Sequence, residues 1–268
     1  MDLIQLIILA IIQGVTEFLP VSSSGHLILA PALIEGWQDQ GPLIDVAAHV
    51  GSLFAVLIYF RKETRALTAG GLDVVRRRET PERRLFLLIA ASTLPFLLIA
   101  PVVVKAGLVD LMRNPTVIGW AFIIGGIFLF IADRRPEAKA GLDGFSWADA
   151  FLIGAAQCFA VIPGASRSGV TMTAARFLGF ERSEAARFSM LMAIPTILML
   201  GGYAFLEILS EGDTAKLADA LLVALLSFLF AWAAIAALMR LTRSISFDAF
   251  VFYRVVLGAI LVFSPLSG

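Results

Sequence analysis

Residues Gln13–Ile28 read QGVTEFLPVSSSGHLI, and this polar segment constrains how the rest of the chain can be arranged. It places a carboxylate, three serine hydroxyls and an imidazole in an otherwise apolar N-terminal region. Buried polar groups are costly unless they bind one another or line a water-filled cavity. A second polar segment, Pro163–Thr171 (PGASRSGVT), lies in a similarly apolar setting. We therefore expect the chemistry in these two segments and a scaffold elsewhere.

The composition is that of an integral membrane protein. Of 268 residues, 59% are hydrophobic and 16% are charged, whereas soluble domains average about half apolar and about a quarter charged residues. The formal net charge is zero, so there is no overall basic field for nucleic-acid binding. One cysteine and two histidines exclude an internal disulfide and a structural zinc cluster. The N-terminus lacks the basic start of a signal peptide, so we expect it to be retained.

Six apolar segments are long enough, or nearly so, to cross a bilayer, which takes about 20 residues. They cover approximately residues 43–60, 85–104, 115–132, 186–208, 218–239 and 248–266. Two further apolar segments, 3–19 and 148–162, run directly into Pro, Gly and Ser instead of a charged loop. We therefore predict an all-α membrane protein with about six transmembrane helices and two inward-facing re-entrant helix pairs.

The two polar segments resemble each other. When Gln13 is placed on Gln157, three further pairs of identical residues align, namely Ser22 with Ser166, Ser24 with Ser168, and Gly25 with Gly169. Three candidate spans follow each copy, and because three is an odd number the second copy must be inverted in the membrane. The pattern predicts one membrane domain, residues 1–268, built as an inverted-topology repeat of residues 1–140 and 145–268, as in many transporters.

Basic residues are distributed unevenly between the predicted spans. Sixteen fall on one side, whereas the other side holds only Lys105, Arg113 and Lys216. The positive-inside rule places the first set in the cytoplasm and both termini outside. We interpret the basic loop from Arg61 to Arg84 as a solvated face that is compatible with contact to anionic lipid.

Glu17 is the most informative single residue, because an ionisable group inside a membrane segment is costly and usually indicates function. Paired with Arg167, it could serve as an acid or base near neutral pH. The alternative is a segment that lies flat at the membrane interface, with Glu17 in water. Gln13 shares the helical face of Glu17 and can orient a group by hydrogen bonds. After Pro20, Ser22–Gly25 form either an anion cradle or a helix cap with a turn.

The two histidines and one arginine allow several interpretations. His26 places a proton carrier beside a candidate nucleophile and within a turn or two of Glu17. We interpret His49, on a predicted span, as a packed or hydrogen-bonded helix residue. Arg254, at membrane depth on the last span, is either a second site cation or an ion-pair partner in helix packing.

The second polar segment combines a helix break at Pro163–Gly164 with a cation between two hydroxyls. In Ser166–Ser168, the central Arg167 has the planar fork that suits phosphate, and Gly169 allows close backbone approach. Thr171 lies nearer this turn than Thr173, which points to the opposite side of a helix starting here. A carboxylate-binding transporter would use similar parts, and a purely structural ion pair with Glu17 is a further alternative.

The motifs EFLPVSSSGH at Glu17–His26, preceded by Gln13, and PGASRSGVT at Pro163–Thr171 resemble the two signature motifs of the bacitracin-resistance type of undecaprenyl-diphosphate phosphatases. The resemblance covers essentially the whole chain. It implies a multi-pass enzyme of the bacterial inner membrane, with its active site facing the periplasm. Such an enzyme hydrolyses a polyprenyl diphosphate lipid to its monophosphate and so recycles the carrier for peptidoglycan synthesis. The resemblance also implies a divalent cation, Mg²⁺ or Ca²⁺.

Carried over by position, the resemblance assigns Glu17 as the acid/base carboxylate and candidate metal ligand, and Ser23 as the hydroxyl beside phosphorus. It gives His26 a role in proton transfer or phosphate contact, and it makes Arg167 a phosphate-holding catalytic residue. The other residues expected at the substrate are Gln13, Ser22, Ser24, Gly25, Ser166, Ser168, Gly169 and Thr171. Some family members carry Glu where this chain has Gln13, so a charged metal ligand at this position is missing here.

Two classes of function stay open at this point. Hydrolysis would proceed through Ser23 as nucleophile or by direct attack of water, whereas the inverted repeat by itself would also suit a lipid or small-anion transporter or flippase. A hydroxyl beside a buried acid favours hydrolysis, because a translocator needs no nucleophile. A lipid-binding structural subunit fits poorly with two polar segments. The expected partners are the polyprenyl diphosphate substrate and membrane lipid, and the sequence leaves room for a homodimer.

Overall fold

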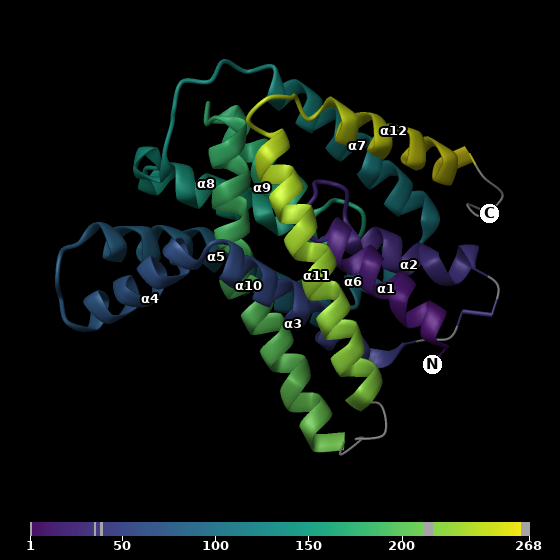
Figure 1. Cartoon of the computed structure of the whole chain (residues 1–268). Coiled ribbons are helices and arrows are strands. Elements are labelled where there is room, and N and C mark those ends of the chain that lie inside the picture. Colours follow the sequence, from purple (N-terminus) through teal and green to yellow (C-terminus); the bar gives the residue numbers. More distant parts are fainter. Residues whose placement is uncertain (1, 35, 38–39, 212–216, 264–268) are drawn as a thin grey trace.

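The computed structural model describes residues 2–34, 36–37, 40–211 and 217–263, and these are almost entirely helical (Figure 1). The described α-helices are α1 (Leu3–Thr16), α2 (Ser23–Leu33), α3 (Gly41–Tyr59), α4 (Arg61–Val75), α5 (Pro81–Lys105), α6 (Leu108–Leu111), α7 (Pro115–Asp133), α8 (Trp147–Gln157), α9 (Arg167–Phe177), α10 (Arg182–Glu211), α11 (Leu217–Leu241) and α12 (Asp248–Phe263). Two short 3₁₀ helices cover Leu142–Gly144 and Cys158–Val161. The described ranges contain no named β-strand, which confirms the all-α prediction.

Three described helices are long and apolar enough to cross a bilayer, namely α5, α7 and α11. A fourth candidate is the pair α3 and α4, which bends by 93° at its break. The predicted segments at 186–208 and 248–266 fall on α10 and α12, but residues 264–266 lie outside the described ranges. The described helices thus support three to four spans, and the count of six stays a prediction.

Helices α1 and α8 are too short to cross a bilayer, with 14 and 11 residues. Each is followed by a turn and a second short helix, α2 or α9. The helix breaks predicted at Pro20 and at Pro163–Gly164 are therefore present. The basic segment from Arg61 to Arg84, which we interpreted as a loop, is instead largely helical. Its helix α4 packs against α5 as a hairpin (Figure 1).

Close helix packing depends on glycine at several places, of which Gly51 and Gly154 are two. A Cβ atom on Gly51 of α3 would collide with the carbonyl oxygen of Ala224 in α11. A Cβ atom on Gly154 of α8 would likewise collide with the carbonyl oxygen of Ser92 in α5. Glycine at these positions lets the helix backbones approach each other directly, as small residues commonly do in membrane proteins.

A buried ion cluster joins the ends of α7 and α9 to the starts of α10 and α12. The Asp133 side chain, only 1% exposed, accepts hydrogen bonds from Arg182 Nε (2.7 Å) and from the Phe247 N–H (3.0 Å). The equally buried Arg176 places its Nε 3.4 Å from the same carboxylate. The hydrogen bond to Asp133 raises the pKa of the Arg182 guanidinium, so Arg182 stays charged.

We expect Asp133→Ala to lower the free energy of unfolding by about 3–5 kcal/mol, because it removes the buried carboxylate that Arg176 and Arg182 share and leaves the buried Arg176 with only the partly exposed Glu137, at 3.5 Å. Thermal unfolding of the purified protein in detergent would measure this loss. Asp248→Ala is the matched control, since Asp248 is half exposed and pairs with the half-exposed Arg134. Such surface pairs contribute about 0–1 kcal/mol. Equal stability of the two variants would contradict the structural role of Asp133.

Candidate active site

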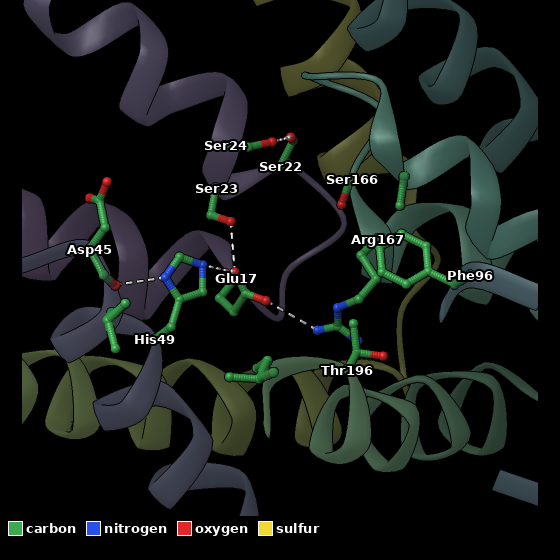
Figure 2. A pocket seen from close by; sticks show the side chains of 13 residues that line it. Glu17, Ser22, Ser23, Ser24, Asp45, His49, Phe96, Ser166, Arg167 and Thr196 are labelled. Atoms are coloured by element: carbon green, nitrogen blue, oxygen red, sulfur yellow. Dashed lines mark hydrogen bonds and ion pairs between the residues drawn. The ribbon is translucent and has the colours of Figure 1, made fainter. Parts of the chain in front are cut away.

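The two polar segments meet at one cavity of about 330 Å³ (Figure 2). From them come six of its lining residues, Glu17, Ser22, Ser23, Ser24, Ser166 and Arg167. The other lining residues come from α3, α5, the second 3₁₀ helix and α10, and they are Asp45, Val46, His49, Phe96, Ala160, Thr196 and Ile197. The prediction that both segments contribute to one inward-facing site is consistent with this arrangement.

Glu17 is the centre of the polar contacts in the cavity. Its Oε2 accepts hydrogen bonds from Ser23 Oγ (2.7 Å) and Gln13 Nε2 (3.1 Å). Its Oε1 accepts one from Arg167 Nη2 (3.3 Å), across 150 residues of sequence (Figure 2). The carboxylate side chain is only 9% exposed, so the alternative in which Glu17 lies in water at the membrane interface is wrong.

Unusual backbone conformations place Ser23 and Arg167 at equivalent positions. Ser22 and Ser166 have positive φ angles of 74° and 70°, which are rare for residues other than glycine. Each caps the following helix, because its Oγ accepts the N–H of the glycine three residues later. Ser23 and Arg167 are therefore the first residues of α2 and α9. Strain of this kind costs about 1–3 kcal/mol and clusters at functional sites.

The cavity therefore lies at the beginning of two helices. The first N–H groups of a helix lack an acceptor within that helix, and the helix dipole adds partial positive charge at this end. With the guanidinium of Arg167 beside them, these two helix ends form a site suited to a phosphate group.

Arg167 is held from two sides. Besides Glu17, it donates from Nη1 to the carbonyl oxygen of Ser189 (3.1 Å). The side chain is 11% exposed and lines the cavity. A clamped guanidinium can bind an incoming anion without first being ordered, which is the condition for effective electrostatic stabilisation.

Several residues that we expected at the substrate are used to build the turns instead. Ser168 Oγ donates to the carbonyl oxygen of Leu19 (2.9 Å), and Thr171 Oγ1 lies 2.7 Å from Ser189 Oγ and donates to the carbonyl of Arg167. Gly25 and Gly169 donate their N–H groups to the capping serines. None of these four residues, nor Gln13, borders the cavity as described. Their predicted contact with phosphate stays a prediction.

His26 lies behind the first turn, away from Glu17. One ring nitrogen is 2.6 Å from the carbonyl oxygen of Ser22 and the other is 2.6 Å from the hydroxyl of Tyr253. The ring also stacks on Tyr253 and meets the edge of Phe122. Both nitrogens are thus engaged in supporting the turn, and the structure does not bring the imidazole to the Ser23 hydroxyl.

Arg254 connects the two polar segments from outside the cavity. Its guanidinium is fully buried and donates to the backbone carbonyls of Phe122, Pro20, Ala121, Gly164 and Ala165. The partners shown are carbonyls from both turns and from α7. Of the two roles we considered, helix packing is the one the contacts support, although the partners are carbonyl oxygens instead of a carboxylate.

We expect Gly125→Ala to destabilise the protein by about 1–3 kcal/mol, because its Cβ would collide with Arg254 Nη2 and displace the guanidinium from both turns. Any activity of the site should fall with the stability. Gly144→Ala is the control, since its Cβ would make only an ordinary contact at 3.7 Å with Phe180. Thermal unfolding of both variants measures the effect. A Gly125→Ala variant as stable as the wild-type protein would show that Arg254 is not confined as described.

The residues of the cavity do not form a protein-built site for a divalent cation. The part of the chain that the structure describes contains no group of three or more His, Cys, Asp or Glu side chains suited to a metal. Position 13 is a neutral amide, and both Glu17 oxygens already accept hydrogen bonds. The Asp45 carboxylate accepts a hydrogen bond from Gln40 Nε2 (3.0 Å). We therefore assign no catalytic step to a metal held by Glu17.

His49 is a titratable cavity residue that the sequence analysis did not place at the site. Its Nδ1 lies 2.8 Å from the Asp45 carbonyl oxygen, which confirms a hydrogen-bonded helix residue. However, the ring also lines the cavity, with Nε2 3.9 Å from Glu17 Oε2. The sequence did contain a signal for this position, because Asp45 and His49 are titratable residues four positions apart, on one face of an apolar helix.

Comparison with known proteins identifies the family of this chain. A family model described as bacitracin resistance protein BacA matches residues 6–260. An undecaprenyl-diphosphatase of Maricaulis maris (strain MCS10) is 53% identical over 267 residues, covering 98% of this chain and 99% of that protein. An undecaprenyl-diphosphatase of Dinoroseobacter shibae (strain DSM 16493 / NCIMB 14021 / DFL 12) is 46% identical over the full length of both. The chain therefore belongs to the bacitracin resistance protein BacA family.

Proposed function

We propose that this protein hydrolyses undecaprenyl diphosphate to undecaprenyl phosphate and inorganic phosphate. The observation that carries the proposal is the Ser23 hydroxyl, which donates to buried Glu17 at 2.7 Å while Arg167 binds the other carboxylate oxygen. A hydroxyl activated by a base beside a fixed cation is suited to attack on phosphorus. The reaction would recycle the lipid carrier for peptidoglycan synthesis and confer bacitracin resistance, as the family name implies.

In the proposed mechanism, Ser23 Oγ attacks the terminal phosphorus of the diphosphate. A bond forms between Oγ and phosphorus, and the hydroxyl proton passes to Glu17. The phosphoanhydride bond breaks, and its electron pair leaves with the prenyl monophosphate. Water then attacks the phosphoserine, and the bond between phosphorus and Oγ breaks. The protons of the water leave with inorganic phosphate, while Glu17 returns to Ser23 the proton that it received. Arg167 and the N-termini of α2 and α9 stabilise the negative charge on the phosphoryl oxygens.

The cavity is suited to a head group instead of a whole lipid. Its volume of about 330 Å³ is small compared with a polyprenyl chain, and its apolar lining includes Val46, Phe96 and Ile197 beside the polar groups. The prenyl tail would therefore stay in the bilayer and pass between the helices. A divalent cation, Mg²⁺ or Ca²⁺, would arrive bound to the diphosphate as part of the substrate, since such hard cations prefer phosphate oxygens.

The proposed membrane arrangement has six spans and two re-entrant helix pairs in an inverted repeat of residues 1–140 and 145–268. The matching φ angles of Ser22 and Ser166 support it. So does the packing, because α1 contacts α11 and α8 contacts α5, so each short helix packs against the other half of the chain. The excess of basic residues on one side supports an inner-membrane protein whose cavity faces the periplasm.

Release of inorganic phosphate from detergent-solubilised undecaprenyl diphosphate, by the purified full-length protein with Mg²⁺ or Ca²⁺, tests the function. We expect release by the wild-type protein and its loss in Glu17→Gln, which retains the size of the side chain but cannot accept the proton. If neither cation supports release, while labelled lipid crosses the membrane of liposomes that contain the protein, the chain is a transporter.

A further inference from the structure

The geometry of His49 determines which of its nitrogens can accept a proton. Its Nδ1 is 2.8 Å from the Asp45 carbonyl oxygen, which can only accept a hydrogen bond, so Nδ1 carries the proton. In the neutral imidazole the lone pair is then on Nε2. This nitrogen points to Glu17 Oε2 at 3.9 Å, as Figure 2 shows. The backbone of α3 thereby orients the acceptor nitrogen toward the carboxylate, as hydrogen bonds at the second nitrogen commonly do for functional histidines.

The other groups around the Glu17 carboxylate cannot take up a proton near neutral pH. Gln13 is an amide, Ser23 is itself the proton donor, and the guanidinium of Arg167 stays protonated. His26 is directed to Tyr253 and the Ser22 carbonyl. Among the described neighbours of Glu17, the imidazole of His49 is thus the group with suitable chemistry.

We propose that His49 accepts the proton of protonated Glu17 during the reaction. This role rests on the proposed phosphatase function. When Ser23 Oγ bonds to phosphorus, its proton moves to Glu17 and from there to Nε2 of His49. Glu17 is then a carboxylate again and can accept a proton from the water that attacks the phosphoserine. As the bond between Oγ and phosphorus breaks, the imidazolium returns its proton through Glu17 to Ser23. The one proton that is left on Glu17, equivalent to the proton taken from water, passes to the departing inorganic phosphate. Both residues then recover their starting protonation states, and one water is consumed.

The distance of 3.9 Å from Nε2 to Oε2 is longer than a hydrogen bond, which spans about 2.7–3.2 Å. The His49 side chain lines the cavity and is 37% exposed, so the ring has room to move. One water molecule between the two groups would also complete the path. Catalytic hydrogen bonds are often long without substrate and shorten when it binds.

The charged groups that share the cavity with His49 are few in the described part of the chain. Glu17 comes from the first turn, Arg167 from α9, and Asp45 from α3 itself. The remaining cavity residues are uncharged, namely Ser22, Ser23 and Ser24 at the start of α2, Val46 of α3, Phe96 of α5, Ala160 of the second 3₁₀ helix, Ser166 before α9, and Thr196 and Ile197 of α10. Helix α11, which also packs against α3, contributes no residue to the described lining. Glu17, Arg167 and Asp45 are thus the charged groups that share the described cavity with His49.

The test compares phosphate release by wild-type protein and by His49→Gln between pH 5 and pH 9. An imidazole accepts a proton only when neutral, and histidine side chains generally change charge near about pH 6.5. Wild-type kcat should therefore fall as the pH decreases through this range. In His49→Gln we expect kcat to be lower by about 10²-fold at neutral pH, with KM little changed and the acid limb displaced to lower pH.

A second variant separates proton transfer from structural support. Imidazole added to His49→Ala should restore part of the turnover, because the cavity left by the side chain is open to the site. Ser52→Ala is the matched control on α3, since Ser52 Oγ donates only to the backbone carbonyls of Ala48 and His49. It should retain the wild-type pH profile. His26→Gln should retain the acid limb, whatever its effect on rate.

Different outcomes overturn different claims. If wild-type protein releases no phosphate, the proposed function fails, and this role fails with it. If wild-type protein is active but His49→Gln keeps its kcat and acid limb, the role of His49 is wrong while the function stands. Loss of the acid limb in His26→Gln, or no response of His49→Ala to imidazole, would also contradict the proposal.

Discussion

Ser23→Ala should lower kcat for phosphate release from undecaprenyl diphosphate by about 10³-fold or more, because it removes the attacking oxygen. The substrate would still bind to Arg167 and to the two helix N-termini, so KM should change much less than kcat. Initial rates of phosphate release at saturating lipid, with the protein shown to be folded by its thermal unfolding, measure the effect.

Ser24→Ala is the informative comparison. Ser24 lines the same cavity, but the contact described for its Oγ is with Ser22 Oγ, at 3.3 Å, and not with Glu17. Ser24→Ala should therefore lose less activity than Ser23→Ala, and the change should appear mainly in KM. When wild-type protein is mixed with substrate labelled in its terminal phosphate and the reaction is quenched early, Ser23 should carry the label. Near-normal turnover by Ser23→Ala would exclude covalent catalysis by this residue and leave direct attack by water.

Arg167→Lys should lower kcat/KM by about 10²-fold or more, although the charge is retained. The guanidinium reaches two groups at once, with Nη1 on the Ser189 carbonyl (3.1 Å) and Nη2 on Glu17 (3.3 Å). A lysine ammonium is a single point charge, so it cannot hold Glu17 in place, keep the Ser189 contact and bind phosphate together. Both kcat and substrate affinity should therefore fall.

Steady-state kinetics and binding of a non-hydrolysable diphosphate lipid measure the two effects separately. Arg135→Lys is the control, because Arg135 is exposed, lies outside the cavity and places its guanidinium over the ring of Phe177. This variant should bind and turn over substrate as the wild-type protein does. Unchanged affinity in Arg167→Lys would show that a bidentate arginine contact is not used.

Only some of the residues that form the site could be predicted from the sequence. Glu17, Ser23 and Arg167 were expected together, and they meet in the cavity. Ser168 and Thr171 were also expected at the substrate, but short hydroxyl side chains can bond to backbone carbonyls instead. In the structure both do so.

Residue order and composition were enough to predict a helical membrane protein and the pairing of its two polar segments. Polar groups in an apolar chain must find each other, and the helix breaks beside them are local properties of Pro, Gly and Ser. The orientations of His49, His26 and Arg254 were decided by tertiary structure alone. Each lies on a helix whose rotation depends on its neighbours, since packing of α3 against α10 and α11 is what turns His49 toward Glu17. Helical periodicity determines which residues share a face, but only packing determines what that face meets.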